Sequence, residues 1–146
     1  MSNQDVTTHK FVAVLNKKAE LGKVVNALAH MSVGLGASAI PEEKELMGFI
    51  DYIDKDGNHH NNLSKNSYVI LRADNSNQIR TARKAALEKG IRVVDFTSTM
   101  QEGTYIDQIN RTKEIPEAEL EYYGICMFGP IAEISELTRK FQLWKI

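Results

Sequence analysis

Three residues near the start of the chain have the types and spacing that chemistry on a bound anion would need. Gly22 and Lys23 open a stretch with the pattern of a helix, and the free backbone amides and dipole at a helix start favour negative charge. His30 follows Lys23 by seven residues, or two helical turns, so their side chains share one face. This spacing predicts a site for an anion or an ester; the alternative is a structural histidine at the edge of a packed helix.

A second candidate lies at the end of an apolar run. Asp95 follows the strand expected at residues 91–94, and Thr97, Ser98 and Thr99 come directly after it. In open α/β sheets, ligands bind beyond the carboxyl ends of strands, so a carboxylate and hydroxyls there could orient a water molecule or bind an anion. The alternative is a turn in which these side chains satisfy backbone groups.

Together the two candidates predict a hydrolytic site in which water is the nucleophile. We expect His30, or Asp95 acting through His30, to be the general base. Lys23 and the helix amides beside Gly22 would hold a phosphate or the developing oxyanion, with hydroxyls from residues 97–99 adding to the anion site. The hypothesis requires His30, Lys23 and Asp95 to converge on one cleft that solvent can reach.

Apolar runs and helical patterns indicate the elements that would position these side chains. Four runs predict buried strands, at Lys10–Leu15, Tyr68–Leu71, Ile91–Val94 and Tyr123–Phe128. Helical patterns begin at Gly22, span Asn75–Lys89, lie within Gln101–Glu121 and begin again at Pro130. Strands that alternate with helices predict one domain over residues 1–146: a three-layer α/β/α fold with a mostly parallel or mixed sheet of four core strands.

A β-hairpin is expected at one edge of that sheet. Asp56-Gly57 separates extended segments at 47–53 and 58–63, and this dipeptide is a strong hairpin signal because glycine tolerates positive φ. The adjacent His59 and His60 point to opposite faces of a strand and cannot chelate together. We therefore expect neither a metal nor another cofactor.

Composition excludes several classes of protein. The chain has 146 residues, of which 42% are hydrophobic and 25% charged, as is typical of globular domains and not of disordered or coiled-coil chains. One cysteine excludes a disulfide framework and a cysteine-based zinc site. No apolar run approaches the ~18 residues of a membrane span, and the first ten residues are too polar for a signal peptide. We expect a cytoplasmic protein without a membrane partner.

The net charge of −1 conceals a segregation of charge along the chain. Residues 72–92 hold six basic and two acidic side chains, and residues 10–23 hold four basic and one acidic, whereas residues 101–121 hold six acidic and two basic. If the two basic segments share a face, that face would attract an anion. The alternative is that these charges are simply solvated on the surfaces of helices. The near-neutral net charge argues against a protein whose main role is to bind long nucleic acid.

The order of these motifs resembles a known family. Lys10–Leu15 followed by Gly22–His30 is similar to the opening of type II peptidyl-tRNA hydrolases, which have a strand, two closely spaced lysines and a helix motif ending in Ala-His. Tyr68–Ala73 resembles the family's second core strand, and Asp95 and Thr99 fall at the Asp and Thr of its Asp-Ala-Gly-Arg-Thr loop. The chain is also similar to the uncharacterised family catalogued as domain of unknown function two thousand.

The resemblance implies a hydrolase fold and, as substrate, an acyl ester or amide on an anionic carrier such as tRNA. The chain departs from the family pattern at Leu21, where the first lysine falls, at Ala27, and at Thr97 and Ser98, where the loop has glycine and arginine. These replacements weaken phosphate contacts. Two alternatives therefore stay open: a non-catalytic module that binds a small anion or metabolite, and a homo-oligomeric interaction protein, such as a dimer formed through Trp144 or the hairpin edge.

Overall fold

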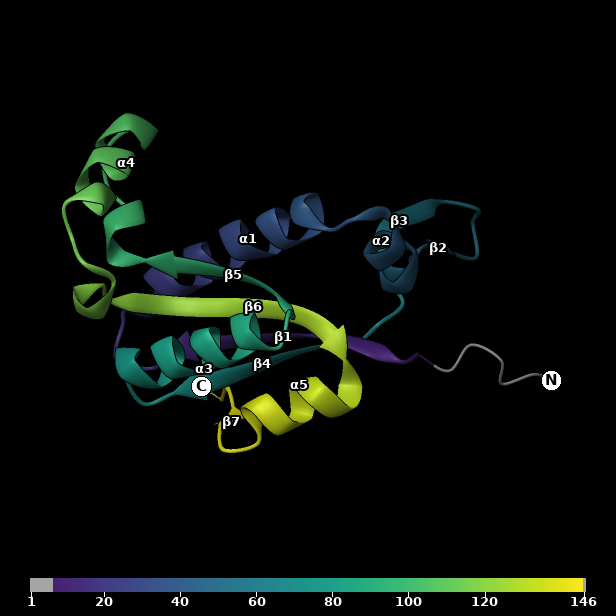
Figure 1. The fold of residues 1–146 in the computed structure, drawn as a ribbon. Coiled ribbons are helices and arrows are strands. Elements are labelled where there is room, and N and C mark those ends of the chain that lie inside the picture. Colours follow the sequence, from purple (N-terminus) through teal and green to yellow (C-terminus); the bar gives the residue numbers. More distant parts are fainter. Residues whose placement is uncertain (1–6, 146) are drawn as a thin grey trace.

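The computed structural model describes residues 7–145, which form three layers around a mixed sheet (Figure 1). The five strands of the sheet lie in the order β5-β6-β1-β4-β7. Their bounds are β1 (His9–Asn16), β4 (Tyr68–Ala73), β5 (Arg92–Thr97), β6 (Tyr122–Pro130) and β7 (Gln142–Leu143). β1 and β4 run parallel, and every other neighbouring pair is antiparallel, so the expected sheet is mixed and not mostly parallel.

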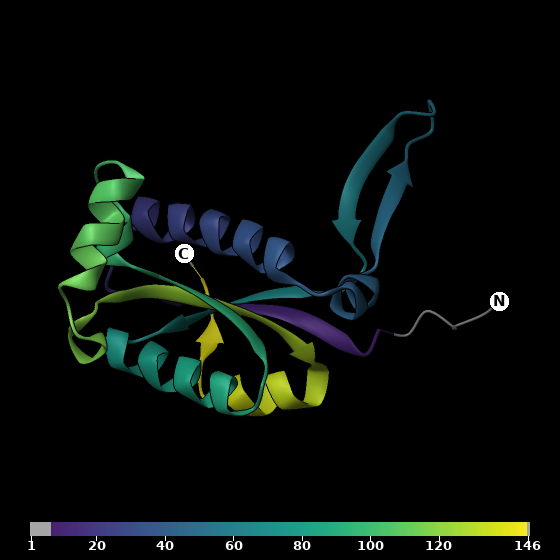
Figure 2. The same cartoon turned by 45° about the horizontal axis from the view of Figure 1, so that its top comes forward.

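Helices cover both faces of this sheet, as the alternating pattern predicts. α1 (Leu21–Ser38) packs on one face, and α3 (Ser76–Glu88) and α5 (Ile131–Thr138) pack on the other (Figures 1 and 2). The side chains that α1 buries are Val24, Ala27, Met31 and Leu35, which recur at helical spacing. The helix continues through Gly34 and Gly36 to Ser38.

Alternation along the strands divides the core into two clusters. Phe11, Ala13 and Leu15 of β1 pack under α1, whereas Val12 and Val14 pack under α3 and α5. Successive side chains of a strand point to opposite faces, and both faces here are covered, which explains the continuous apolar run of β1. The face of the sheet to which a strand side chain points therefore decides which helices it packs against.

The hairpin exists but does not join the edge of the main sheet. β2 (Phe49–Ile53) and β3 (His59–Ser64) form a separate two-stranded sheet, which projects from the body of the molecule (Figure 2). α2 (Pro41–Met47), a short helix that was not predicted, connects α1 to this hairpin. The fifth strand of the main sheet is instead β7, whose two residues are too few to give a pattern.

The acidic segment expected to be helical contains α4 (Tyr105–Lys113) and a short 3-10 helix, η2 (Glu117–Glu119). A second 3-10 helix, η1 (Ser98–Met100), follows β5. α4 lies beyond the end of the sheet, near the start of α1 (Figures 1 and 2). Across residues 7–145, no helix is long and apolar enough to cross a membrane.

Candidate anion-binding site

The structure separates the residues of the predicted hydrolytic site. β5 does not stop at residue 94 but continues to Thr97, so Asp95 lies inside the strand, paired with Ile125 of β6. Alternation then directs Asp95 and Phe96 to opposite faces. The Asp95 carboxylate accepts a hydrogen bond from Arg83 of α3 at 3.0 Å, whereas the ring of His30 stacks on Phe96 at 5.6 Å. The expected convergence of Asp95 with His30 and Lys23 is therefore wrong.

Three of the predicted site residues lie on the first helix of the fold. Lys23 and His30 lie on this helix, half-buried and exposed respectively. The Lys23 ammonium is 3.8 Å from the Glu20 carboxylate, and Gly22 has open space where a Cβ would be. Among residues 7–145, no carboxylate forms a hydrogen bond with His30. A lysine and a histidine are thus brought to one helix without the acid that the hydrolytic hypothesis requires.

Two of the three hydroxyls expected to bind an anion, those of Thr97 and Thr99, are engaged within the protein. Thr97 and Thr99 are buried, and their hydroxyls form a hydrogen bond of 2.7 Å with each other. The hydroxyls of Thr99 and of Thr112 on α4 form a second hydrogen bond, of 2.8 Å. Ser98 is half-buried, and its backbone N–H donates to the carbonyl of Glu121. Thr97 and Thr99 therefore hold α4 against the end of β5, which leaves them no place in an open anion site.

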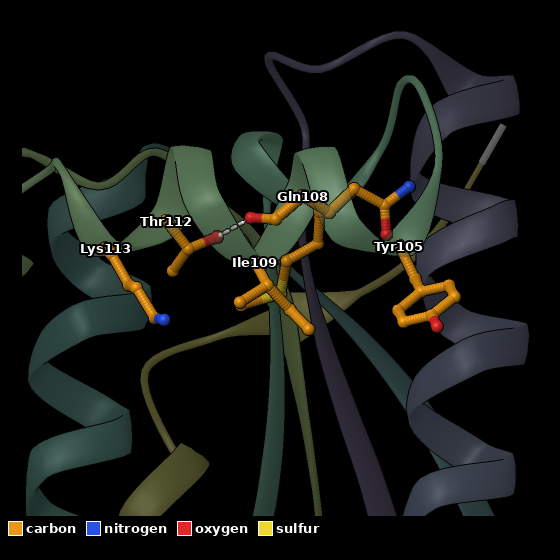
Figure 3. A pocket seen from close by; sticks show the side chains of 6 residues that line it. Tyr105, Gln108, Ile109, Thr112 and Lys113 are labelled. Atoms are coloured by element: carbon orange, nitrogen blue, oxygen red, sulfur yellow. Dashed lines mark hydrogen bonds between the residues drawn. The ribbon is translucent and has the colours of Figure 1, made fainter.

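A hollow of about 410 Å³ lies along α4 next to these threonines (Figure 3). Its lining residues are Met100, Tyr105, Gln108, Ile109, Thr112 and Lys113. Figure 3 shows the side chains of Tyr105, Ile109 and Lys113 extending from α4, while the Thr112 hydroxyl donates to the Gln108 carbonyl at 2.7 Å. With one cation in a largely apolar lining, this hollow is poorly suited to an anion.

The two basic segments meet elsewhere, at the carboxyl ends of β1 and β4. Because these strands are parallel neighbours, they end at the same side of the sheet, and the backbone N–H of Lys17 donates to the carbonyl of Ala73 at 3.0 Å. We call the hollow of about 270 Å³ at this place the basic hollow. Its lining residues are Lys17, Arg72, Asp74, Gln78, Lys140, Phe141 and Gln142.

One carboxylate partly neutralises the basic hollow. The Lys17 ammonium lies 2.9 Å from Asp74, and both side chains remain accessible to water. The hydrogen bond and the charge of Lys17 hold the pKa of Asp74 below its usual range. The backbone N–H of Asp74 donates to the side-chain oxygen of Gln78 at 2.7 Å. Asp74 is therefore ionised at neutral pH and offsets the charge of Lys17.

The other two cations of the basic hollow have no acidic partner. Arg72 donates to the neutral side chain of Gln142 at 2.5 Å, and the ammonium of Lys140 lies 5.9 Å from the centre of the Phe141 ring. Within the described part of the chain, neither Arg72 nor Lys140 forms an ion pair. Asp74 also lies within the field of Arg72, so its one negative charge is set against three positive ones, and the basic hollow keeps a net charge of about +2.

A larger hollow on α3 shows the contrast. Its volume is about 560 Å³, and Arg80, Arg83 and Lys84 contribute to its lining. Arg80 is paired with Glu117 at 3.1 Å, and Arg83 is paired with Asp95. Carboxylates of the same protein therefore neutralise both guanidinium groups, which leaves Lys84 as the remaining cation among the described residues that line this hollow.

The start of α3 adds to the electrostatics of the basic hollow. Asn75 caps this helix by accepting the backbone N–H of Gln78 at 3.0 Å, as its position in the sequence predicts. Gln78 also lines the basic hollow, so the positive end of the α3 dipole lies beside it. Lys17 and Arg72 were not predicted as site residues. The signal that could have found them is the charge of their segments together with the parallel pairing of β1 and β4.

Comparisons with known proteins show a family without a known activity. Residues 9–145 match the model of a family described as a protein of unknown function (DUF2000). A solved structure of a protein of unknown function from Agrobacterium tumefaciens strain C58 is similar, with a TM-score of 0.79, 17% identity, and coverage of 96% of this chain and 100% of that one.

No curated protein matches the chain. The structural likeness, at its low identity, shows the fold alone. Because neither similar protein has a known activity, the resemblance to type II peptidyl-tRNA hydrolases stays a prediction.

Proposed function

This chain belongs to the DUF2000 family of proteins of unknown function, and on that premise we propose that it is a binding module for a small anion. The site is the basic hollow, and the ligand is a phosphate or carboxylate group on a small molecule. The observation that carries the proposal is that Arg72 and Lys140 line one concave site and, among the described residues, neither forms an ion pair.

The side chains of the basic hollow suit this ligand. Arg72 presents a planar guanidinium that can bind two oxygens of one anion, and Gln142 holds that group in place. Lys140 adds a mobile point charge. Three cations and one carboxylate leave a charge of about +2, which matches a phosphate monoester. The volume of about 270 Å³ lies below the ~300–1,000 Å³ of pockets for drug-sized ligands and suits a small group.

Placement of Asp95 favours binding over hydrolysis. The hydrolytic hypothesis needs a base that a carboxylate orients, but Asp95 is bound to Arg83 on the opposite face of the sheet from His30. The small-anion alternative needs neither group. The net charge of −1 also suits a small ligand better than a long nucleic acid.

Titration with inorganic phosphate and with glycerol 3-phosphate at low ionic strength tests the proposal. Calorimetry and the chemical shifts of the backbone amides measure the binding. We expect saturable binding that weakens about five- to tenfold in Arg72→Gln and in Lys140→Gln, since each lost charge removes on the order of 1 kcal/mol at a solvated site. Lys84→Gln is the matched control, because it removes the same charge from an exposed position on α3. Absence of saturation, or an equal loss in Lys84→Gln, would refute the site.

A turnover assay separates this proposal from the hydrolytic alternative. We expect purified wild-type protein to leave peptidyl-tRNA intact. Turnover that disappears in both Lys23→Ala and His30→Ala would show a hydrolase and overturn the proposal of binding without chemistry.

A further inference from the structure

A second cavity lies at the base of hairpin β2–β3, at the opposite end of β4 from the basic hollow. Its volume is about 320 Å³. The sheet, α1 and the hairpin all contribute to its lining, and the residues that matter most are Phe11, Gly36, Phe49, Tyr52, Leu63 and Tyr68. We call it the aromatic cavity. Tyr68 begins β4, whereas Arg72 lies near its end, so the two sites share a strand but not a lining residue.

We propose that the aromatic cavity binds a small planar aromatic molecule that carries a hydrogen-bonding group. The rings of Phe11 and Tyr68 stack with centroids 5.3 Å apart and planes at 7°, so two parallel rings contribute to the lining. Phe49 and Tyr52 of the hairpin are 45% and 52% exposed. Clustered apolar side chains left in water mark a binding surface, and a planar ring can stack on these side chains.

Gly36 keeps part of the aromatic cavity open. It lies within α1, where glycine is unfavourable relative to alanine, and it needs no positive φ. A Cβ built at Gly36 would meet no atom within 4 Å. The helix thus tolerates its least favourable ordinary residue at a position where a side chain would enter the cavity.

Polar groups at the cavity can orient a ligand. The hydroxyls of Ser32 and Tyr68 form a hydrogen bond of 2.7 Å, and both residues contribute to the lining. The side-chain nitrogen of Asn66 donates to the carbonyls of Leu46 and Met47, at 2.7 and 3.2 Å. Because that nitrogen is engaged, the amide oxygen of Asn66 is the atom left to accept. A few placed polar groups in an apolar lining are the usual composition of a small-molecule pocket.

The dimensions of the cavity favour a small molecule over a protein partner. A volume of about 320 Å³ is at the low end of the ~300–1,000 Å³ range for ligand pockets and fits one or two rings. A stable protein interface buries on the order of 1,200 Å² of surface, whereas a cavity of this volume encloses a single small molecule. The base of the hairpin is also fixed, because Lys65 N–H donates to Gly48 at 2.9 Å and the Ser64 hydroxyl bonds to Met47. The wall that the hairpin supplies is therefore formed before a ligand arrives.

Titration of ¹⁵N-labelled protein with 2-naphthol tests the proposal, with decahydro-2-naphthol as the saturated control of similar size. We expect saturable shifts of the amides of Ser32, Gly36 and Asn66, and binding of the saturated control about fivefold weaker, because it cannot stack. Gly36→Leu, which fills the cavity, should weaken binding at least about tenfold. Ala37→Leu adds the same side chain at the adjacent exposed position, outside the lining, and should leave binding unchanged.

Three results would overturn the proposal. The first is the absence of saturable shifts with 2-naphthol in a folded protein. The second is equal affinity for the saturated control, which would indicate an apolar void without aromatic selectivity. The third is a concentration-dependent shift of the same amides without any ligand, coupled to dimer formation in light scattering, which would assign the surface to a second copy. The phosphate titration measures different residues, so either proposal can fail alone.

Discussion

The partner of Asp95 is the most discriminating test of this structure, because it decides on which face of the sheet the carboxylate lies. Arg83 donates to Asp95 at 3.0 Å, and the two side chains are only 31% and 22% exposed. Two unit charges about 4 Å apart attract by about 4 kcal/mol at the effective dielectric constant of ~20 found near protein surfaces. Desolvation and the remaining access to water reduce this, since exposed pairs contribute about 0.2–1 kcal/mol and broken buried pairs cost about 3–5 kcal/mol.

We therefore expect Asp95→Asn to lower the free energy of unfolding by about 2 kcal/mol. In a chain of this length, that loss corresponds to a fall in Tm of about 4–8 °C. A double-mutant cycle of Asp95→Asn with Arg83→Gln should give a coupling energy of about 1.5 kcal/mol. The same cycle with His30→Ala should give a coupling energy within about 0.5 kcal/mol of zero, because the sheet separates the two side chains.

Urea unfolding at pH 7, followed by circular dichroism, measures all of these variants. Repeating the cycle in high salt should reduce the coupling of Asp95 with Arg83, since salt screens a pair that solvent still reaches. A coupling energy between Asp95 and His30 above about 1 kcal/mol, with none between Asp95 and Arg83, would refute the placement of Asp95. It would also restore the hydrolytic hypothesis.

Three further predictions concern the elements around the candidate sites. Thr99→Val should lower the free energy of unfolding by about 2 kcal/mol and reduce amide protection in α4, because it leaves the buried hydroxyl of Thr97 without its partner and removes the bond to Thr112. Unchanged protection in hydrogen exchange would contradict this role. Burial raises the pKa of Cys126 to about 12. At pH 8, iodoacetamide should therefore alkylate this thiol at least about 100-fold more slowly in the native state than in urea. Equal rates would contradict its burial. Burial opposes the charge of Glu43, but the side chain of Arg92 and the N–H of Ile40 outweigh it and hold the pKa below 4.5. The stability that Glu43 contributes is then present above about pH 4.5 and is lost as the pH falls through the folded-state pKa. Glu43→Gln should therefore reduce the fall in the free energy of unfolding at acid pH. Identical curves of unfolding free energy against pH for the two proteins would show that the pair of Glu43 and Arg92 contributes nothing.

Local patterns predicted the elements of this fold well, because their causes lie within a few residues. The Asn75 cap and the helix it begins depend on neighbours in the next turn, and the apolar runs of β1, β4 and β6 need only a covered sheet. Gly57 has a φ of 88°, as the hairpin turn requires. The two residues of β7 are too few to give a pattern. α2 does carry local helix signals, with Pro41 at its start, Glu42 and Glu43 in its first turn and Gly48 after its end, so it could have been predicted from the sequence.

The extent of β5 shows where local reasoning stops. A carboxylate after two valines suggests the end of a strand, but pairing with β6 carries the strand on to Thr97. Which face Asp95 joins depends on its register against Ile125, and register is a property of two strands that lie far apart in the chain.

The amino-acid order alone determined the strands and helices, the hairpin turn, the shared flank of Lys23 and His30, and the two basic segments. Only the tertiary structure decided that Asp95 turns away from His30, and that Lys17 and Arg72 meet at the ends of parallel strands. The reason is physical: helix faces and turns arise from residues a few positions apart, whereas a site between strands exists only once the sheet has chosen their neighbours, direction and register.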